Sequence, residues 1–361
     1  MKLLLATDAW APQVNGVVRS LERTCAELES RGWSVTVLSP EGRRTLPCPT
    51  YPEIRLTLRP GKAAAEVLGA ADYDCIHIAT EGPLGWAMRR ACRARGLAFT
   101  TSYHTRFPEY LRMRLPVPLA LGYAMIRSFH GAAARTMVRT PTQARELTER
   151  GLQNLRVWPG AVDTALFRPR DKNALALPRP IAMYVGRVAP EKNLEAFLDL
   201  DLPGSKVVVG GGPSLQRLRR RYPEAHFPGY RHGKALAETL AAADVFVFPS
   251  RTDTLGLVML EAMAAGVPVA AFPVPGPANV VIDGATGALD EDLREAVFRA
   301  LACPDDACVD HARQFTWEAS ARRFAELLIP TGRGCQDGVY NRQPCPSPLP
   351  GPKPASTSPA N

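Results

Sequence analysis

Short apolar runs alternate with helical patterns along almost the whole of this chain. Leu3–Ala6, Val35–Leu38 and Cys75–Ala79 are short and mostly apolar, as buried strands are. Between such runs, stretches like Val17–Arg31 and Leu84–Arg95 place apolar residues at helical spacing. Strands that alternate with helices predict an α/β fold, in which a parallel sheet carries helices on both faces.

The alternation lapses once, between residues 163 and 180, and then starts again. Asp171, Lys172 and Asn173, with prolines on either side, are typical of a connection between domains. A chain of 361 residues is long enough for two α/β domains. We therefore predict two Rossmann-like domains, residues 1–170 and 171–329.

The other predicted strands are Ile54–Leu58, Ala98–Ser102, Thr136–Arg139, Leu155–Trp158, Ile181–Val185, Lys206–Val209, Ala225–Phe227, Val245–Pro249 and Val267–Phe272.

The end of the chain has a different composition. A helical pattern over Trp317–Leu328 is the last one, and from Pro330 onward Pro, Ser, Gly and Thr dominate. Such a segment cannot bury enough apolar area to offset its chain entropy. We predict that residues 330–361 form a disordered tail with no catalytic role.

Positive charge is concentrated in the first half. The chain has a net charge of +9, and residues 84–160 hold thirteen arginines against three glutamates, a local net charge of +10. This pattern favours an electropositive face for an anionic membrane surface or a phosphorylated substrate. The alternative is a general bias toward arginine, since the chain has 37 Arg and 7 Lys. Nucleic acid is not an expected partner, because no binding module is recognisable.

The cysteines and the hydrophobic segments bear on the compartment. Eight cysteines occur without a C-x-x-C pair or a Cys/His cluster at zinc spacing, which favours reduced thiols. The N-terminus has no apolar stretch of signal-peptide length, and no window approaches 18 apolar residues. We expect a cytoplasmic protein, peripheral on the inner face of the membrane if the basic face binds lipid.

Two cations follow the first predicted strand of the second half. The segment Tyr184–Lys192 comes after a strand and before a helix, and Gly186 permits a tight turn with close backbone approach. Arg187 and Lys192 therefore lie at the carboxyl end of a strand, where open α/β sheets bind ligands. Two cations there suit a diphosphate. The alternative is a solvated basic loop.

The segment Phe248–Pro268 carries two carboxylates, Asp253 and Glu261, separated by seven residues. Gly256 is predicted to open a helix, with Glu261 two turns inside it. Asp253 can then reach a sugar hydroxyl, and Glu261 can accept from the vicinal hydroxyls of a ribose. The alternative is a capping Asp and an exposed helix Glu. The backbone N–H groups predicted to meet the ligand belong to Leu255, Gly256, Leu257 and Val258.

Taken together, these segments resemble family 4 glycosyltransferases of the two-Rossmann-domain (GT-B) type, in the bacterial branch of α-mannosyltransferase-like and glycolipid-forming enzymes. The resemblance covers residues 1–329. The signature of the family is an acidic residue and a Glu with seven residues between them. The family usually has Glu at the first position, where this chain has Asp253. The segments Asp8–Leu21, Ser102–Leu111 and Trp158–Asp163 also match. The segment from Phe315 resembles the start of the terminal helix, which in this fold crosses back to the first domain.

The resemblance implies a site in a cleft between the two domains. His104 would meet the donor sugar, and Gly16 would approach the phosphates. The leaving diphosphate would be stabilised by Arg187 and Lys192. Asp253 would orient the sugar and Glu261 would hold the ribose. We expect neither a cofactor nor a tightly bound metal, because no cluster of Asp residues lies near these motifs.

The resemblance also implies the reaction, which is transfer of a hexose from a nucleoside-diphosphate sugar to a lipid or glycan acceptor, with retention of configuration. GDP-mannose is the preferred donor, and UDP-glucose, UDP-galactose and UDP-sulfoquinovose are alternatives. A module that binds a sugar nucleotide without transferring the sugar is an alternative of another class. A dinucleotide site is disfavoured because no G-x-G-x-x-G follows the first strand.

Overall fold

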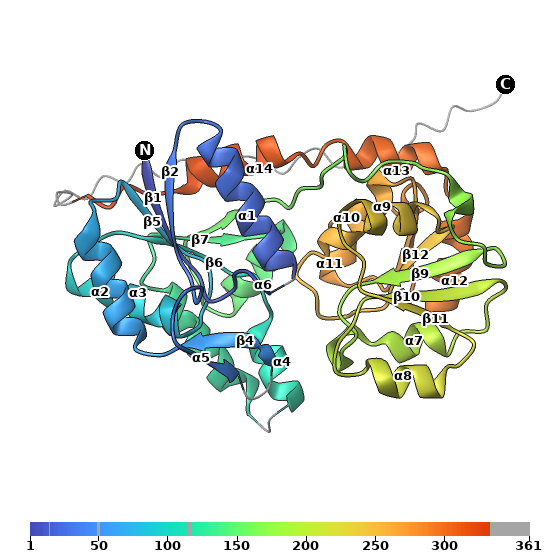
Figure 1. Ribbon diagram of the computed structural model, residues 1–361, viewed down its shortest axis with the longest axis horizontal. Helices are drawn as coiled ribbons and strands as arrows, with labels where there is room; N and C mark the ends of the chain where they lie inside the picture. Colours follow the sequence, from blue (N-terminus) through green and yellow to red (C-terminus); the bar gives the residue numbers. More distant parts are fainter. Residues whose placement is uncertain (14, 49–50, 115–116, 333–361) are drawn as a thin grey trace.

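The computed structural model describes residues 1–13, 15–48, 51–114 and 117–332. Two lobes, each built on a six-stranded sheet, lie side by side along the long axis (Figure 1). The strand orders are β2-β1-β5-β6-β7-β8 and β11-β10-β9-β12-β13-β14. All neighbouring strands in both sheets are parallel. The predicted α/β class with two Rossmann-like units is confirmed.

The first lobe contains most of the first half of the chain. Its elements are β1 (Lys2–Ala6), α1 (Gly16–Glu29), β2 (Ser34–Leu38), β3 (Thr45–Cys48), β4 (Tyr51–Thr57), α2 (Pro60–Ala70), β5 (Cys75–Ile78), α3 (Pro83–Ala94), β6 (Thr100–Ser102), α4 (Phe107–Arg114), α5 (Leu119–His130), β7 (Arg135–Val138), α6 (Pro141–Glu149) and β8 (Leu155–Val157).

The rest of the chain forms the second lobe and a helix that returns to the first. Its elements are η1 (Lys172–Ala174), β9 (Ile181–Val185), η2 (Pro190–Lys192), α7 (Leu194–Leu198), β10 (Ser205–Val209), α8 (Leu215–Arg221), β11 (His226–Gly229), α9 (Gly233–Ala241), β12 (Val245–Phe248), α10 (Leu257–Ala264), β13 (Val269–Ala271), α11 (Pro275–Ala278), β14 (Gly287–Leu289), α12 (Leu293–Leu301), α13 (Asp305–Ala312) and α14 (Trp317–Leu327).

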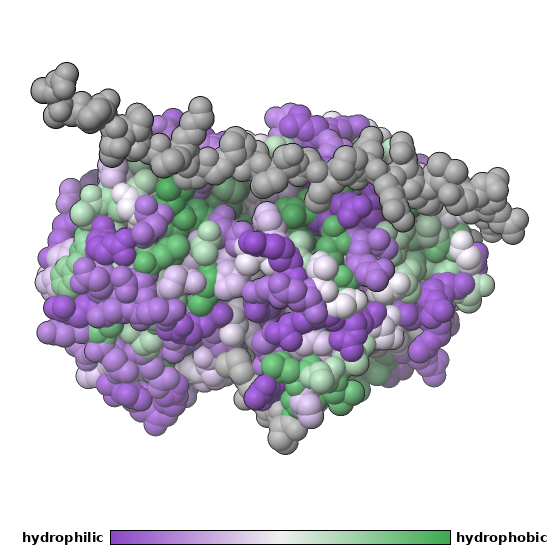
Figure 2. Space-filling view, turned by 180° about the vertical axis from the view of Figure 1, so that it is seen from behind, coloured by the Kyte–Doolittle hydropathy of each residue, from purple (hydrophilic) through white to green (hydrophobic). Residues whose placement is uncertain are grey.

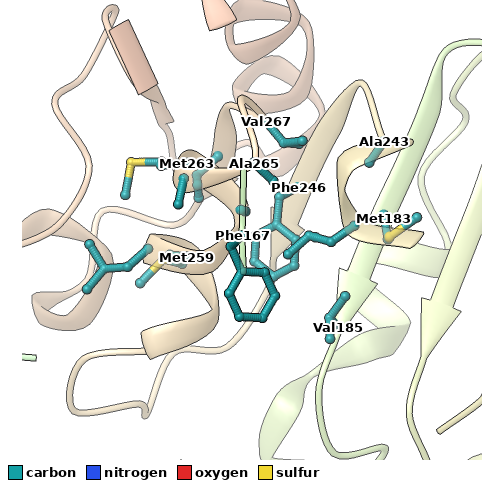
Figure 3. Close-up of a cluster of buried hydrophobic side chains, with 14 of the residues drawn as sticks. Phe167, Met183, Val185, Ala243, Phe246, Met259, Met263, Ala265 and Val267 are labelled. Atoms are coloured by element: carbon teal, nitrogen blue, oxygen red, sulfur yellow. The ribbon is translucent and has the colours of Figure 1, made fainter. Parts of the chain in front are cut away.

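Each sheet is buried on both faces, as the continuous apolar runs predict. Along β9, Met183 and Val185 point into one hydrophobic cluster, while Ala182 and Tyr184 point into another on the opposite face. Figure 3 shows the first of these clusters, in which Phe167 packs among side chains of the second lobe. The chain therefore enters the second core before its first strand begins.

One predicted strand lies outside the parallel sheets. The run Ile54–Leu58 falls in β4, which pairs antiparallel with β3 and joins neither six-stranded sheet. The physical reason is the short connection between β3 and β4. A parallel pairing needs a crossover of about a dozen residues or more, whereas a direct reversal gives an antiparallel pair.

The last helix crosses back to the first lobe, as the family resemblance implies. Phe324 and Leu327 of α14 pack in one cluster with Leu3 and Trp158. Trp158 Nε1 donates to Ser320 Oγ at 3.0 Å. In Figure 1, α14 lies across the first lobe beside α1. The terminal helix therefore packs against the first strand and the first helix of the chain.

The ordered chain continues slightly further than predicted. Pro330 bridges to Cys75, and Thr331 donates from its amide to the Asp74 carbonyl at 2.8 Å and from its hydroxyl to the Tyr73 carbonyl at 2.7 Å. The predicted start of the tail at residue 330 is therefore wrong by at least two residues, because Pro330 and Thr331 both pair with the backbone of the first lobe. Residues 333–361 of the predicted tail lie outside the described residues.

Candidate functional site

The loops that follow β9 and β10 are held tightly against each other. Gly186 donates its amide to the Val209 carbonyl at 3.0 Å, and a Cβ on Gly210 would lie 1.9 Å from the Gly186 carbonyl oxygen. The Tyr184 hydroxyl donates to the Arg187 carbonyl at 3.0 Å. Gly186 has φ of 154°, and a Cβ there would lie 2.5 Å from the Tyr184 hydroxyl. The backbone of the Arg187 loop is thus fixed at the sheet edge.

Lys192 and Asp253 form a buried ion pair. Lys192 Nζ lies 2.5 Å from Asp253 Oδ1, and both side chains are less than a fifth exposed. Burial disfavours the charged amine, but the Asp253 carboxylate outweighs burial and raises the pKa of Lys192. Asp253 Oδ2 is buried and has no hydrogen-bond partner among the residues that the structure describes. The pair thus places a charged lysine and a buried carboxylate oxygen at this edge of the sheet.

The first domain contributes Tyr110 to the same place. Tyr110, on α4, hydrogen-bonds the side chain of Thr252 and lies near Lys192 and Asp253. Burial raises the pKa of the Tyr110 phenol, which keeps it a hydrogen-bond donor at neutral pH. Sequence reasoning missed this residue, although it lies in the Ser102–Leu111 segment, six residues after His104.

Helix α10 begins directly after Gly256, which has a left-handed backbone with φ of 79°. A Cβ at Gly256 would lie 2.8 Å from the Phe248 ring, so a glycine fits both the turn and the space. Glu261 lies just over one turn inside α10, not two turns as predicted, because it is only four positions after Leu257, where the helix begins.

Glu261 is neither exposed nor unpaired. Its side chain is 12% exposed, and Oε1 accepts from Arg19 Nη1 of α1 at 2.8 Å. Burial raises the pKa of Glu261, and the Arg19 cation opposes that rise. The alternative interpretation as an exposed helix Glu is therefore wrong. Arg19, three residues after Gly16, was not predicted from the sequence.

The starts of α1 and α10 meet across the domain boundary. Asn15 Oδ1 caps α1 by accepting from the amides of Val17 and Val18 at 3.0 Å. A Cβ on Gly16 would lie 3.9 Å from Leu257, and a Cβ on Gly160 would lie 2.3 Å from Leu255. Both domains therefore contribute predicted donor-binding residues to one contact. Val258 is half-buried against the second lobe's core.

His104 is buried at the carboxyl end of β6. Its ring nitrogens lie 2.8 Å from Ser102 Oγ and 3.3 Å from Arg139 Nη2. Its carbonyl accepts from Thr254 Oγ1 of the second domain at 2.9 Å. Burial, with the nearby Arg139 cation, lowers the pKa of His104 well below its usual range. The contact with a sugar stays a prediction, and it would require one ring nitrogen to exchange its present partner.

A second cross-domain contact lies beside helix α6. Thr140 caps this helix by accepting from the Gln143 amide at 3.1 Å. Pro141 takes the first helical position, where a missing N–H is harmless. Thr142 donates to Asn279 Oδ1 at 3.2 Å.

In the described part of the chain, no group of three or more His, Cys, Asp or Glu side chains is arranged to hold a metal ion. The helices described there include none with the length and apolar character needed to cross a membrane.

The fold is that of glycosyltransferases of the GT-B class. Sucrose-phosphate synthase from Thermosynechococcus elongatus has the same fold, with a TM-score of 0.74 at 21% identity over 90% of this chain and 98% of that one. Anabaena HepE, solved with UDP and glucose, superposes with a TM-score of 0.66 at 16% identity over 90% of this chain and 98% of that one.

Sequence comparison identifies the family. The model of Glycosyltransferase Family 4 matches residues 14–166, and that of Glycosyl transferases group 1 matches residues 179–303. A GDP-mannose-dependent alpha-mannosyltransferase from Mycobacterium tuberculosis is 30% identical over 316 residues, 80% of this chain and 83% of the relative. Sulfoquinovosyl transferase SQD2 from Arabidopsis thaliana is 30% identical over 314 residues, 78% of this chain and 62% of the relative. The chain belongs to family 4 of the glycosyltransferases.

Proposed function

We propose that this protein transfers a mannosyl group from GDP-mannose to a lipid or glycan acceptor, with retention of the anomeric configuration. The observation that carries the donor assignment is the 30% identity, over 83% of its length, with a GDP-mannose-dependent alpha-mannosyltransferase. Proteins of the same name from Corynebacterium glutamicum and Mycolicibacterium smegmatis are 28% and 30% identical.

In this proposal, five of the predicted site residues have separate roles. Glu261, buried at the start of α10, accepts from the ribose hydroxyls. Asp253 accepts from a sugar hydroxyl through Oδ2, the carboxylate oxygen that has no partner. Lys192 and Arg187, at the carboxyl end of β9, offset the charge of the departing diphosphate. Neutral His104 offers its ring to the same sugar.

Retention follows from attack on the face that the diphosphate leaves. The bond between the anomeric carbon and the phosphate oxygen breaks, and a short-lived ion pair forms. The acceptor hydroxyl attacks from the same side, and its proton goes to the departing phosphate oxygen. This route needs no protein nucleophile and no second carboxylate acting as a base. Lys192 and Arg187 stabilise the charge that develops.

A UDP-sugar is the second candidate donor. The specific observation in its favour is the 30% identity with a sulfoquinovosyl transferase, although this chain spans only 62% of that relative. UDP-glucose and UDP-galactose belong to the same group of alternatives. The reaction chemistry and the residue roles are the same for each of these donors.

A lipid acceptor would bring the protein to the inner surface of a membrane. Arginines are concentrated in the first domain, and each arginine near an anionic surface contributes on the order of 1 kcal/mol, screened by salt. In Figure 2, hydrophilic residues cover most of the visible described surface, and hydrophobic residues gather in separate patches. We therefore propose weak, salt-sensitive peripheral association with anionic lipid. Equal absence from anionic and neutral vesicles in low-salt flotation would contradict it.

The test is incubation of the purified protein with GDP-mannose, UDP-glucose, UDP-galactose and UDP-sulfoquinovose, each with a membrane extract, followed by product mass measurement. A product heavier than its acceptor by one mannosyl residue, formed only with GDP-mannose, supports the proposal. A product formed only with a UDP-sugar would replace the donor. Tight donor binding without any product would favour a non-catalytic binding module.

A further inference from the structure

The residue that follows β7 in the first domain is a buried cation, Arg139. Only 6% of its surface is exposed. Nη2 donates to Ser20 Oγ on α1 at 2.7 Å, and the guanidinium lies 3.9 Å from the centre of the Trp158 ring. Among the residues that the structure describes, no carboxylate hydrogen-bonds this guanidinium, and Nη1 has no partner. A buried charge without a counter-charge is costly, which suggests that the guanidinium serves a purpose other than stability.

The remaining partner of Arg139 is His104, whose Nδ1 lies 3.3 Å from Nη2. A guanidinium can only donate, so Nδ1 must be the acceptor. Because His104 is neutral, its one proton is then on Nε2. That N–H donates to Ser102 Oγ at 2.8 Å. A single contact with an obligate donor therefore assigns the tautomer of His104.

The hydrogen bonds that follow, from Ser102 into the sheet, run in the same donor-to-acceptor direction. Ser102 has its own hydrogen left for Nε2 of His77 at 3.1 Å, a better distance than the 3.4 Å to the Ala79 carbonyl. His77 then carries its proton on Nδ1 and donates to Thr100 Oγ1 at 2.9 Å. Thr100 donates to the Ile76 carbonyl at 3.3 Å. Every bond runs in one direction, from a group that can only donate to one that can only accept.

The backbone of His104 lies beside the donor site. The His104 carbonyl accepts from Thr254 Oγ1 of the second domain at 2.9 Å, and Thr254 directly follows Asp253. Asp253 is paired with Lys192. The orientation of His104 therefore affects how the first domain contacts the loop of the second domain that carries Asp253 and Thr254.

We propose that Arg139 is a positioning residue for the transfer reaction. It donates to His104, fixes the Nε2–H tautomer and so orients the peptide that receives Thr254 from the other domain. The inference rests on the proposed function in one respect, the role of Asp253 at the donor sugar. Arg139 itself touches neither the donor nor the acceptor.

The charges around His104 explain why this tautomer persists. Besides burial, the groups that lower its pKa are Arg139 after β7, His77 on β5 and His130 on α5. All three are cationic or neutral. Loss of the Arg139 cation leaves burial in place but removes the obligate donor at Nδ1, so that Nδ1 becomes free to take up a proton as the pH falls.

The first test needs no substrate. Nitrogen-15 spectra of the histidine rings in the wild-type protein, assigned by His104→Gln and His77→Gln, report which nitrogen carries the proton. The expected result at pH 7 is Nε2–H for His104 and Nδ1–H for His77. The opposite tautomer at His104, or a charged His104 ring, would overturn the proposal. Failure of the proposed transfer reaction would leave this result unchanged.

The second test compares Arg139→Met with Arg139→Lys, and with Arg95→Met as a control that removes an exposed arginine of the same domain. For Arg139→Met we expect kcat to fall about tenfold to a hundredfold, because the reacting groups are no longer held in the right geometry. The KM for the donor should stay within about twofold of the wild-type value. We also expect kcat to fall at a higher pH on the acid side than in the wild type, because His104 loses one of the causes that lower its pKa while burial remains. Arg139→Lys should restore most of kcat. Wild-type kcat and pH profile in Arg139→Met would overturn the proposal, and if that variant does not fold the ring spectra still decide.

Discussion

Arg19 of helix α1 donates through Nη1 to Glu261 Oε1 of helix α10 at 2.8 Å, which joins the two domains at the predicted ribose site. The Glu261 side chain is only 12% exposed in this contact. The carboxylate proposed to hold the ribose therefore already accepts a hydrogen bond from Arg19. A donor must share the carboxylate with Arg19 or replace Arg19.

Glu261→Ala should weaken GDP-mannose binding while the protein stays folded. Loss of a carboxylate that accepts from two hydroxyls costs about 1.5–3 kcal/mol. Calorimetry with GDP-mannose measures the change. The control is Glu238→Ala, which removes an exposed helix glutamate paired with Lys234. Unchanged binding in Glu261→Ala would remove the ribose role.

Arg19→Met should make donor binding depend on pH. Burial raises the pKa of Glu261 and Arg19 lowers it, so loss of the cation moves the pKa further up. The carboxylate is needed for binding, is present above its pKa and is lost as the pH falls. As the pH is lowered, affinity for GDP-mannose should therefore begin to fall at a higher pH than in the wild type.

The matched control for Arg19→Met is Arg23→Met. Arg23 lies one turn further along the same helix and pairs with Asp163, not with Glu261. Its loss should leave the pH dependence of donor binding unchanged. If the two variants show the same pH dependence, the effect comes from the charge of the helix and not from the pair with Glu261.

Transfer should not require a divalent metal. The charge of the departing diphosphate is instead offset by Arg187 and Lys192, with a fractional charge from the start of α10. We expect full wild-type activity after extensive chelation, and large losses in Arg187→Ala and Lys192→Ala. Activity that is abolished by chelation and restored by Mg²⁺ or Mn²⁺ would contradict this prediction.

Two truncations separate the end of the ordered chain from the Pro-rich segment beyond it. A protein ending at Gly332 should keep the melting temperature and activity of the full chain, because the deleted composition cannot bury apolar area. A protein ending at Ile329 also loses the hydrogen bonds of Thr331, each worth about 0.5–1.5 kcal/mol. Its melting temperature should be lower by several degrees. A similar drop in the longer protein would show that the deleted segment stabilises the fold.

Periodicity predicted most of the fold because both sheets are buried on both faces. The strand Ile181–Val185 was predicted with its observed bounds, since five apolar residues are flanked by polar and proline residues. The run Ile54–Leu58 shows where this reasoning fails. An apolar run indicates a strand but does not name its partner, and here the partner is β3, next to it in the chain.

The candidate site was predicted in part for a similar reason. Asp253 and Glu261 lie within one short segment, so their spacing can be read from the sequence. Arg19 is 242 residues from Glu261, and Arg139 is 119 residues from Ser20. Such contacts arise only when distant segments of the chain fold against each other, and no local pattern encodes them. Of the residues missed, Arg19 and Tyr110 lay inside segments already singled out, Asp8–Leu21 and Ser102–Leu111.

The central claim is retaining transfer of mannose from GDP-mannose, and the most direct measurement is the anomeric configuration of the product. The donor is α-configured, so the account predicts an α-mannoside, identified by the proton–carbon coupling at its anomeric centre in an NMR spectrum recorded soon after mixing. A β-mannoside would contradict retention. The absence of any mannosylated product, with transfer from a UDP-sugar under the same conditions, would contradict the donor assignment.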